Sequence, residues 1–235
     1  MNKELLQCAT NEALYWWIRD EYYYHKIFSN LNTIYKDDKQ LEFFSSYLFQ
    51  PFVRQYSVHR TLKKIKENKI ELLRLLNKAN FYGNVVEGNT GIIDFIASNL
   101  PDKYKNGKPI SFLSKFAFLI NPKEFSLYDS FARNALNKIR KHENKDNKAI
   151  KSSYSDFISF LNMELQINRS EILSQSKLLE KFSQYSGVSF LEINIEVFIR
   201  RVYDKYLWLY NQKENEKRGL SDSSTVKAIL KYYGS

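Results

Sequence analysis

The sequence contains very little of the glycine and proline that interrupt regular structure: 7 glycines and 4 prolines among 235 residues. Between them, apolar residues recur with the three- to four-residue spacing of amphipathic helices, and the alternating stretches typical of strands are hard to find. The sequence therefore predicts an all-α fold. Because hydrophobic residues make up 43% of the chain, it also has enough apolar side chains for a substantial core.

Turn-forming residues set the bounds of the predicted helices. The clearest predicted loop is 80–91, which contains three glycines, and a second loop, 101–109, is bounded by prolines. Polar connections are predicted at 141–153 and 211–224. The predicted helices are 3–19, 21–34, 38–49, 57–79, 90–99, 110–120, 129–142, 152–165, 170–185, 189–211 and 222–232. At this length we expect a single all-helical domain, 1–235, with two lobes, roughly 1–100 plus 190–235, and 101–189.

Charge and cysteine content narrow the classes of function. The 36 Lys and Arg outnumber the 26 Asp and Glu, and the formal net charge of +10 favours a polyanionic partner, nucleic acid before a membrane surface. Cys8 is the only cysteine, which excludes a disulfide framework, a Cys-rich zinc site and an iron–sulfur cluster. The three histidines lack metal-ligand spacing and no glycine-rich nucleotide motif is present, so we expect no metal and no cofactor.

The chain also lacks the patterns of secretion and membrane insertion. Its N-terminus does not resemble a signal peptide, and no apolar run approaches the ~18 residues that a membrane span requires. We therefore expect a cytoplasmic protein without a membrane partner.

The most informative stretch is 111–131, SFLSKFAFLINPKEFSLYDSF. Its first ten residues predict a helix that is apolar on every side and therefore buried. Lys115 lies in the middle of this helix, so its amine either reaches solvent along its stem or lines a cleft with little water. In the second case, desolvation favours the neutral amine that a nucleophile requires. Asp129 stands where the N-cap of the next helix is expected.

The pattern S-K, a short apolar helix, N-P and then Y-D-S, between residues 114 and 130, resembles the core of the helix–hairpin–helix DNA glycosylase superfamily. It is most similar to divergent bacterial proteins of the 8-oxoguanine glycosylase type, over about 105–140. The resemblance implies a two-lobed helical bundle that acts on double-stranded DNA with one flipped base. It also implies that Lys115 attacks C1′ of a modified or damaged nucleotide, forming a Schiff base, with help from Asp129. The role would be repair or defence against foreign DNA.

The same resemblance implies phosphate-binding residues. The superfamily's glycine-rich hairpin is absent as such, and residues 104–111, YKNGKPIS, stand in its place, with a single glycine. The interval from lysine to aspartate is also shorter than in the best-known members. The implied nucleic-acid-binding residues are Lys105, Gly107, Lys108, Ser111 and Arg133. The helix after Asp129 adds three cations suited to phosphate contacts, Lys138, Arg140 and Lys141.

The base pocket is expected among aromatic side chains. The segment 11–25, NEALYWWIRDEYYYH, is predicted to be mostly core. However, Trp16 and Trp17 point ~100° apart around a helix, so one of them can stack on a flipped base. The candidates for this pocket are Trp16, Trp17 and Tyr128.

Two alternative functions stay open. Arg54 and His59, separated by four residues, match the spacing of the Arg–His motif of helical-bundle ribonucleases, in which His59 would transfer a proton and Arg54 would hold the phosphate. The other alternative is a non-catalytic DNA-binding module. Basic residues are concentrated in 60–78, with seven basic and two acidic residues, and in 102–151, with twelve and five.

Overall fold

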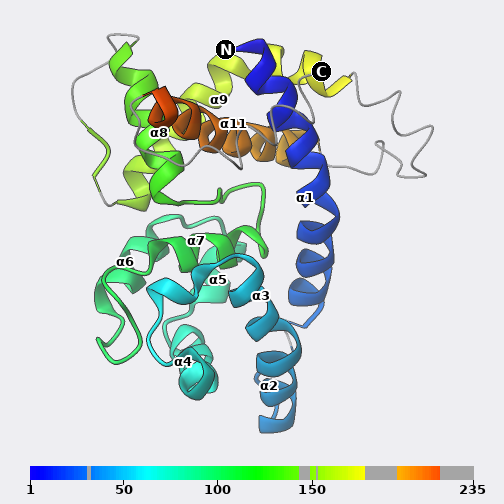
Figure 1. The fold of residues 1–235 in the computed structure, drawn as a ribbon. Helices are drawn as coiled ribbons and strands as arrows, with labels where there is room; N and C mark the ends of the chain where they lie inside the picture. Colours follow the sequence, from blue (N-terminus) through cyan, green and yellow to red (C-terminus); the bar gives the residue numbers. More distant parts are fainter. Residues whose placement is uncertain (31–32, 143–148, 152, 178–194, 218–235) are drawn as a thin grey trace. The chain divides into compact units, whose positions relative to one another are not determined.

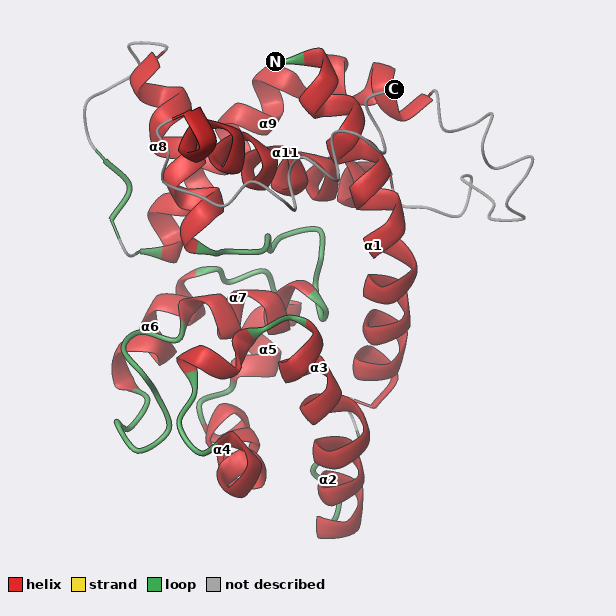
Figure 2. Cartoon of the chain, viewed as in Figure 1, coloured by secondary structure: helices red, strands yellow, loops and turns green. Residues whose placement is uncertain are grey.

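The computed structural model describes residues 1–30, 33–142, 149–151, 153–177 and 195–217 (Figure 1). Within these residues the regular secondary structure is helical, as Figure 2 shows, and the β-pairing recorded is an isolated antiparallel bridge between Leu62 and Lys105. The prediction of an all-α fold is confirmed.

The chain divides into two compact units that alternate along the sequence. Unit 1 comprises residues 1–18, 129–151 and 159–235, and unit 2 comprises residues 19–128 and 152–158. The main boundary therefore falls at 128/129, whereas the lobes predicted from the sequence divided at 100/101. The physical reason is packing: helix 110–118 contacts helix 91–99 within unit 2, and helix 130–142 contacts helix 195–217 within unit 1.

Unit 2 is built around one buried aromatic cluster. Phe116 is fully buried, and its ring lies 5.5 Å from that of Phe49, 5.4 Å from Phe52, and 6.0 Å from both Phe81 and Phe112. Aromatic rings at these separations bury large apolar areas. The helices of the unit are the last part of α1 (Lys3–Asn30), α2 (Asp38–Phe44), the π-helix η1 (Ser45–Phe49), α3 (Gln50–Gln55), the 3₁₀ helix η2 (Val58–Thr61), α4 (Ile65–Lys78), α5 (Phe81–Val86), α6 (Gly91–Asn99), α7 (Ile110–Phe118) and the first residues of α9 (Tyr154–Lys177).

Unit 1 contains the first part of α1, α8 (Ser130–His142), the rest of α9 and α11 (Ile195–Lys217). α8 packs against α11 (Figure 1). The Trp17 ring meets Phe198 of α11 edge-on at 5.7 Å, and the backbone N–H of Asn2 donates to the Tyr206 hydroxyl at 3.1 Å. Contacts with α11 therefore fix the start of α1 in this unit.

Several predicted helix bounds are wrong for identifiable reasons. α1 runs through the break predicted at residue 20, and α9 runs through the break predicted at 166–169, because neither place has a glycine or proline to end a helix. The loop predicted at 80–91 contains α5, which buries Phe81 and Val85 on one face. The predicted helix 38–49 divides at the π-helix η1, and 57–79 divides into η2 and α4.

The remaining helix predictions agree with the structure or lie outside it. The predictions 90–99, 110–120 and 129–142 are confirmed to within two residues by α6, α7 and α8. The described part of the predicted helix 189–211 is helical, and α11 continues past the predicted end to Lys217. The predicted helix 222–232 and the end of 170–185 lie outside the described residues.

Candidate active site and nucleic-acid-binding surface

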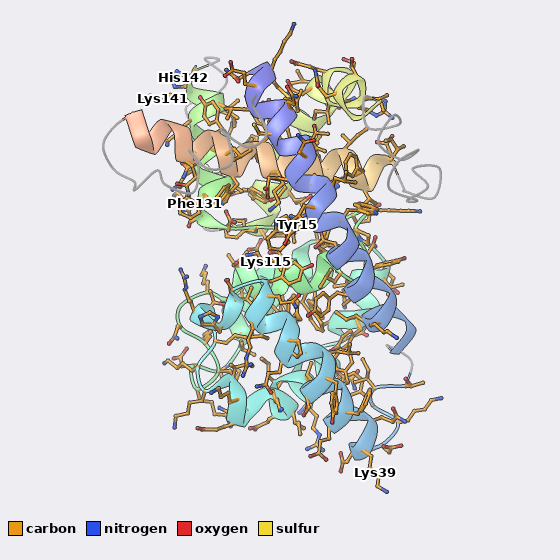
Figure 3. All side chains as sticks on the ribbon, turned by 45° about the vertical axis from the view of Figure 1, so that its right-hand side comes forward. Tyr15, Lys39, Lys115, Phe131, Lys141 and His142 are labelled. Atoms are coloured by element: carbon orange, nitrogen blue, oxygen red, sulfur yellow. The ribbon has the colours of Figure 1, made fainter. Side chains whose placement is uncertain are left out.

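Lys115 lies in the middle of α7, a helix in the core of unit 2. Seven of its nine residues are buried, and Lys115 is half-buried. The prediction of a buried helix that carries one lysine is confirmed. Figure 3 labels the Lys115 side chain, with that of Lys39 at the opposite end of the same unit.

A backbone carbonyl group holds the Lys115 amine. Lys115 Nζ donates to the carbonyl oxygen of Tyr56 at 3.3 Å. Tyr56 is itself fixed, because its buried ring packs 5.1 Å from Phe52 and 5.8 Å from Tyr23, and its hydroxyl donates to the buried carboxylate of Asp20. The amine is therefore oriented by a residue that is anchored at its ring.

A second hydrogen bond ties the chain just before Lys115 to the chain just before Asp129. The hydroxyl of Ser114, which solvent does not reach, accepts the backbone N–H of Tyr128 at 3.2 Å and donates to the Ser111 carbonyl at 3.3 Å. A buried N–H group needs such a partner. The end of the 119–128 segment is therefore attached to α7.

Asp129 begins the α8 segment of unit 1. Its Oδ1 accepts the backbone N–H of Ala132 at 2.8 Å, so the prediction that Asp129 caps this helix is confirmed. The cap uses one of the two carboxylate oxygens. Lys115 belongs to unit 2, and its pairing with Asp129 stays a prediction.

The predicted phosphate-binding residues before α7 have different surroundings. Lys105 Nζ donates to the carbonyls of Ala97 and Ser98, at 3.3 and 3.1 Å, and the side chain is only 12% exposed. It therefore binds the last turn of α6, where a cation is favourable, instead of pointing toward a phosphate. Lys108 is exposed, Ser111 is half-buried, and Gly107 takes the left-handed conformation, with φ of 69°.

The basic residues of α8 also differ from prediction. Arg140 is buried, with its guanidinium 3.4 Å from the centre of the Phe160 ring, and Lys138 Nζ donates to Asn211 at 3.0 Å. These two side chains hold unit 1 together, which corrects their assignment to phosphate contacts. Arg133 is half-buried and Lys141 is exposed.

Two of the three candidates for the base pocket lie in the core. Trp17 is 6% exposed and packs on Phe198, and Tyr128 is 7% exposed and packs 5.1 Å from Phe157. In this structure neither ring presents a free face to a base, which corrects the prediction for both. Trp16 is half-buried, and Lys205 Nζ lies 4.1 Å from its ring centre.

The residues of the alternative ribonuclease motif are both on the surface of unit 2. Arg54 lies in the last turn of α3 and His59 lies in η2, and both are exposed. Ser57 between them takes a left-handed conformation, with φ of 54°, that separates the two helices. No hydrogen bond or ion pair joins Arg54 to His59 among the described residues. The ribonuclease function stays a prediction.

The structure adds a set of cations of which the sequence predictions named only Lys108. Backbone hydrogen bonds place the segment 60–66 beside the segment 103–108. Within the described residues, the exposed cations of these two segments that form no ion pair are Arg60, Lys63, Lys64, Lys66 and Lys108, here called the basic surface. The sequence signal for it is the basic run at 60–66, but the pairing with 103–108 depends on the fold.

Other kinds of site find no support in the described part of the chain. There, no three His, Cys, Asp or Glu side chains gather in a way that could hold a metal ion. A helix with the length and hydropathy needed to cross a bilayer is not found among the same residues. No family model, no curated protein sequence and no solved structure matches this chain. The functional argument therefore depends on the residues themselves.

Proposed function

We propose that this protein is a DNA glycosylase with lyase activity that removes a modified or damaged base, with Lys115 as the nucleophile. The observation that carries the proposal is the oriented amine of the half-buried Lys115 on helix α7, seven of whose nine residues are buried. A lysine nucleophile needs a partly desolvated amine with a fixed direction, and the Tyr56 carbonyl supplies that direction.

The elements on either side of Lys115 support the proposed relationship to helix–hairpin–helix glycosylases. α6 and α7 pack against each other and are joined by residues 100–109, which include the left-handed Gly107. The bond between Ser114 and Tyr128 ties together the positions before Lys115 and Asp129, the two residues that the resemblance assigns to catalysis.

The proposed reaction begins when the neutral Lys115 amine attacks C1′ of an extruded nucleotide. The bond from C1′ to the base breaks, and its electron pair leaves with the base, which takes up a proton. The attacking nitrogen loses a proton, and the C1′–O4′ bond then opens, with the ring oxygen taking the electron pair and a proton. A protonated Schiff base remains, and loss of a C2′ proton then expels the 3′ phosphate.

Asp129 has a defined task in this proposal. Its carboxylate would stabilise the positive charge that develops on the sugar as the base departs, an electrostatic effect that a preorganised group provides best. The N-cap bond to Ala132 fixes the carboxylate and uses only one of its oxygens. Asp129→Asn keeps the cap, because Asn is an equally good N-cap residue, and removes the charge.

Borohydride trapping tests the nucleophile directly, because it reduces a Schiff base to a stable covalent bond. The assay uses the full chain and duplex oligonucleotides that carry oxidised, deaminated, alkylated or abasic nucleotides. We expect the wild type to be trapped on at least one of these duplexes and Lys115→Gln on none. Lys39→Gln is the matched control, since Lys39 is exposed at the opposite end of unit 2 (Figure 3).

Two results would contradict the proposed function. One is equal trapping of wild type and Lys115→Gln, and the other is no trapping of the wild type on any duplex, the abasic one included. Circular dichroism and thermal melting of Lys115→Gln show whether the variant is folded. The expected change in melting temperature is small, because Lys115 is only half-buried.

A further inference from the structure

The basic surface is assembled from two segments that are about 40 residues apart in the sequence. The backbone N–H of Lys63 donates to the Tyr104 carbonyl at 2.9 Å, and the N–H of Asn106 donates to the Thr61 carbonyl at 3.0 Å. The Asn106 side chain adds a bond of 3.3 Å to the Arg60 carbonyl. These antiparallel contacts fix the backbone from which the cations of both segments project.

The cations of the basic surface form no ion pairs with described residues, unlike two neighbouring cations of unit 2. Lys103 pairs with Glu71 at 3.1 Å, and Arg74 pairs with Asp38, so these two charges are neutralised within unit 2. In contrast, the five residues of the basic surface are exposed and form no ion pair with any described residue. These two short segments therefore bring together five exposed cations that no described acidic group neutralises.

We infer that the basic surface binds the sugar–phosphate backbone of duplex DNA. The inference rests on the proposed function for the choice of DNA over other polyanions. Exposed Lys and Arg side chains on a rigid backbone provide the sequence-independent part of DNA binding, because each cation that neutralises a phosphate releases condensed counterions. One of the two segments of the surface, 103–108, directly precedes α7, the helix that carries Lys115.

The apolar residues of the same segments argue against insertion into a membrane. Insertion of an amphipathic segment into a lipid surface requires exposed apolar side chains among the cations. Here Leu62 and Tyr104 are buried, at 4% and 1% exposure, and Ile65 is half-buried. What these segments present to solvent is charge and amide groups, which suit phosphates.

A substitution at one position of the basic surface can distinguish an effect on DNA binding from an effect on folding. Lys64 precedes α4 with φ of 45° and ψ of 39°, a left-handed conformation in which glycine is favoured over residues with a Cβ atom. Lys64→Gly should therefore keep or raise the melting temperature while it weakens DNA binding. If Lys64 only supported the fold, Lys64→Gly would lower the melting temperature and leave DNA binding unchanged.

The main experiment measures how binding depends on salt. Fluorescence anisotropy with an undamaged duplex of about 20 base pairs gives the affinity between roughly 50 and 300 mM NaCl. We expect the triple variant Lys63→Gln, Lys64→Gln, Lys66→Gln to bind roughly 10- to 100-fold more weakly at low salt. We also expect the slope of log K against log salt to become shallower by about 0.9 for each phosphate that the variant no longer neutralises.

The matched control removes the same charge elsewhere on unit 2. The variant Lys36→Gln, Lys39→Gln, Lys78→Gln changes three exposed lysines, two of them at or just before α2 and one at the far end of α4. It should retain the affinity and the slope of the wild type. If both triple variants weaken binding equally, net charge and not this surface binds DNA, and the inference is wrong.

Other outcomes also decide the question. Unchanged DNA binding by the first triple variant, or tighter binding of wild type to single-stranded RNA or to phosphatidylserine vesicles than to the duplex, overturns the inference. Its failure is distinct from failure of the proposed function. Lys115→Gln should bind the duplex normally while trapping is abolished. If the wild type binds the duplex but is never trapped, the basic surface still binds DNA and the proposed glycosylase function is wrong.

Discussion

Ser114 connects α7 to the end of the 119–128 segment through a hydroxyl group that is closed off from solvent. Ser114→Ala removes the buried hydroxyl that accepts the Tyr128 N–H. Removing one partner of a buried hydrogen bond costs about 1–3 kcal/mol. We expect a decrease of this size in the free energy of unfolding, measured by urea denaturation, together with weaker borohydride trapping.

Ser98→Ala is the matched control for this substitution, because Ser98 is exposed at the end of α6. It should change the free energy of unfolding by less than about 0.5 kcal/mol. Equal stability of Ser114→Ala and Ser98→Ala would show that the Ser114 hydroxyl does not hold the 119–128 segment.

At the scale of single residues, sequence patterns identified Lys115 as unusual but could not separate one surface lysine from another. Lys115 was recognisable because its neighbours on α7 are mostly apolar. Lys105 and Lys108 stand in the same basic run, yet Lys105 binds carbonyls of α6 whereas Lys108 is exposed. That difference depends on where the last turn of α6 lies, and the spacing of charges in the sequence does not predict this position.

At the scale of helices, Asp94 links α6 to the start of α9. Its carboxylate accepts the backbone N–H groups of Tyr154 and Ser155, at 2.8 and 2.9 Å, and the hydroxyls of Ser153 and Ser155, at 3.2 and 2.8 Å. Burial by itself raises the pKa of Asp94, but these four hydrogen bonds outweigh it and hold the pKa below its ordinary value.

The sign of the pH dependence follows from that direction. Because the pKa is lower in the folded protein, the carboxylate stabilises the fold above the unfolded pKa of about 3.9, and this contribution disappears as the pH falls through the folded pKa. We expect Asp94→Asn to lower the free energy of unfolding at pH 7 by about 1 kcal/mol. The difference from wild type should shrink below about pH 4.

Asp102→Asn is the control for Asp94→Asn, since the Asp102 side chain is 94% exposed and lies 3.8 Å from Lys105 Nζ. It should change stability by under about 0.5 kcal/mol. Urea denaturation from about pH 3 to pH 7 measures both variants. A constant difference between Asp94→Asn and wild type over this range would contradict the role of the charged carboxylate.

Gly88 determines how α5 gives way to α6. It has φ of 79°, and a Cβ atom there would lie 3.0 Å from Cγ of Glu124. Gly88→Ala should therefore lower the free energy of unfolding by about 1–2 kcal/mol, measured by thermal or urea denaturation. Gly91→Ala, in the first turn of α6 without positive φ, should be neutral or slightly stabilising. Equal effects of the two substitutions would contradict this explanation.

The helices that sequence could predict are those with clear boundaries. α7 is bracketed by Pro109 and by Asn121-Pro122, and its predicted start is the observed one. α5 was hidden because Gly83 and its neighbours are typical of a loop. In the structure Asn80 takes a left-handed conformation, with φ of 50°, between α4 and α5, and Phe81 and Val85 of α5 are buried in the core. Burial of these two side chains stabilises α5, and local helix propensity alone does not predict that burial.

At the scale of the whole molecule, the two units alternate along the chain. The chain leaves unit 2 after Tyr128, passes through the α8 segment of unit 1, and returns to unit 2 for residues 152–158. The sequence predicted two lobes but not this division, because the return depends on contacts between residues far apart in the chain. The phenol ring of Tyr154 stacks 6.2 Å from Phe125, which no periodicity could indicate.

Tyr154→Phe tests whether this returning segment is needed for the stability of unit 2. The fully buried Tyr154 hydroxyl accepts the Ser126 N–H at 2.9 Å and donates to the Ser126 carbonyl at 3.0 Å. Phenylalanine keeps the ring but leaves both backbone groups without that partner, so we expect a decrease of about 2 kcal/mol in the free energy of unfolding by urea denaturation. Tyr15→Phe, at a tyrosine 69% exposed, should be neutral. If Tyr154→Phe is equally neutral, the Tyr154 hydroxyl does not help to hold the returning segment, and ring packing and the hydrogen bonds to Asp94 are sufficient.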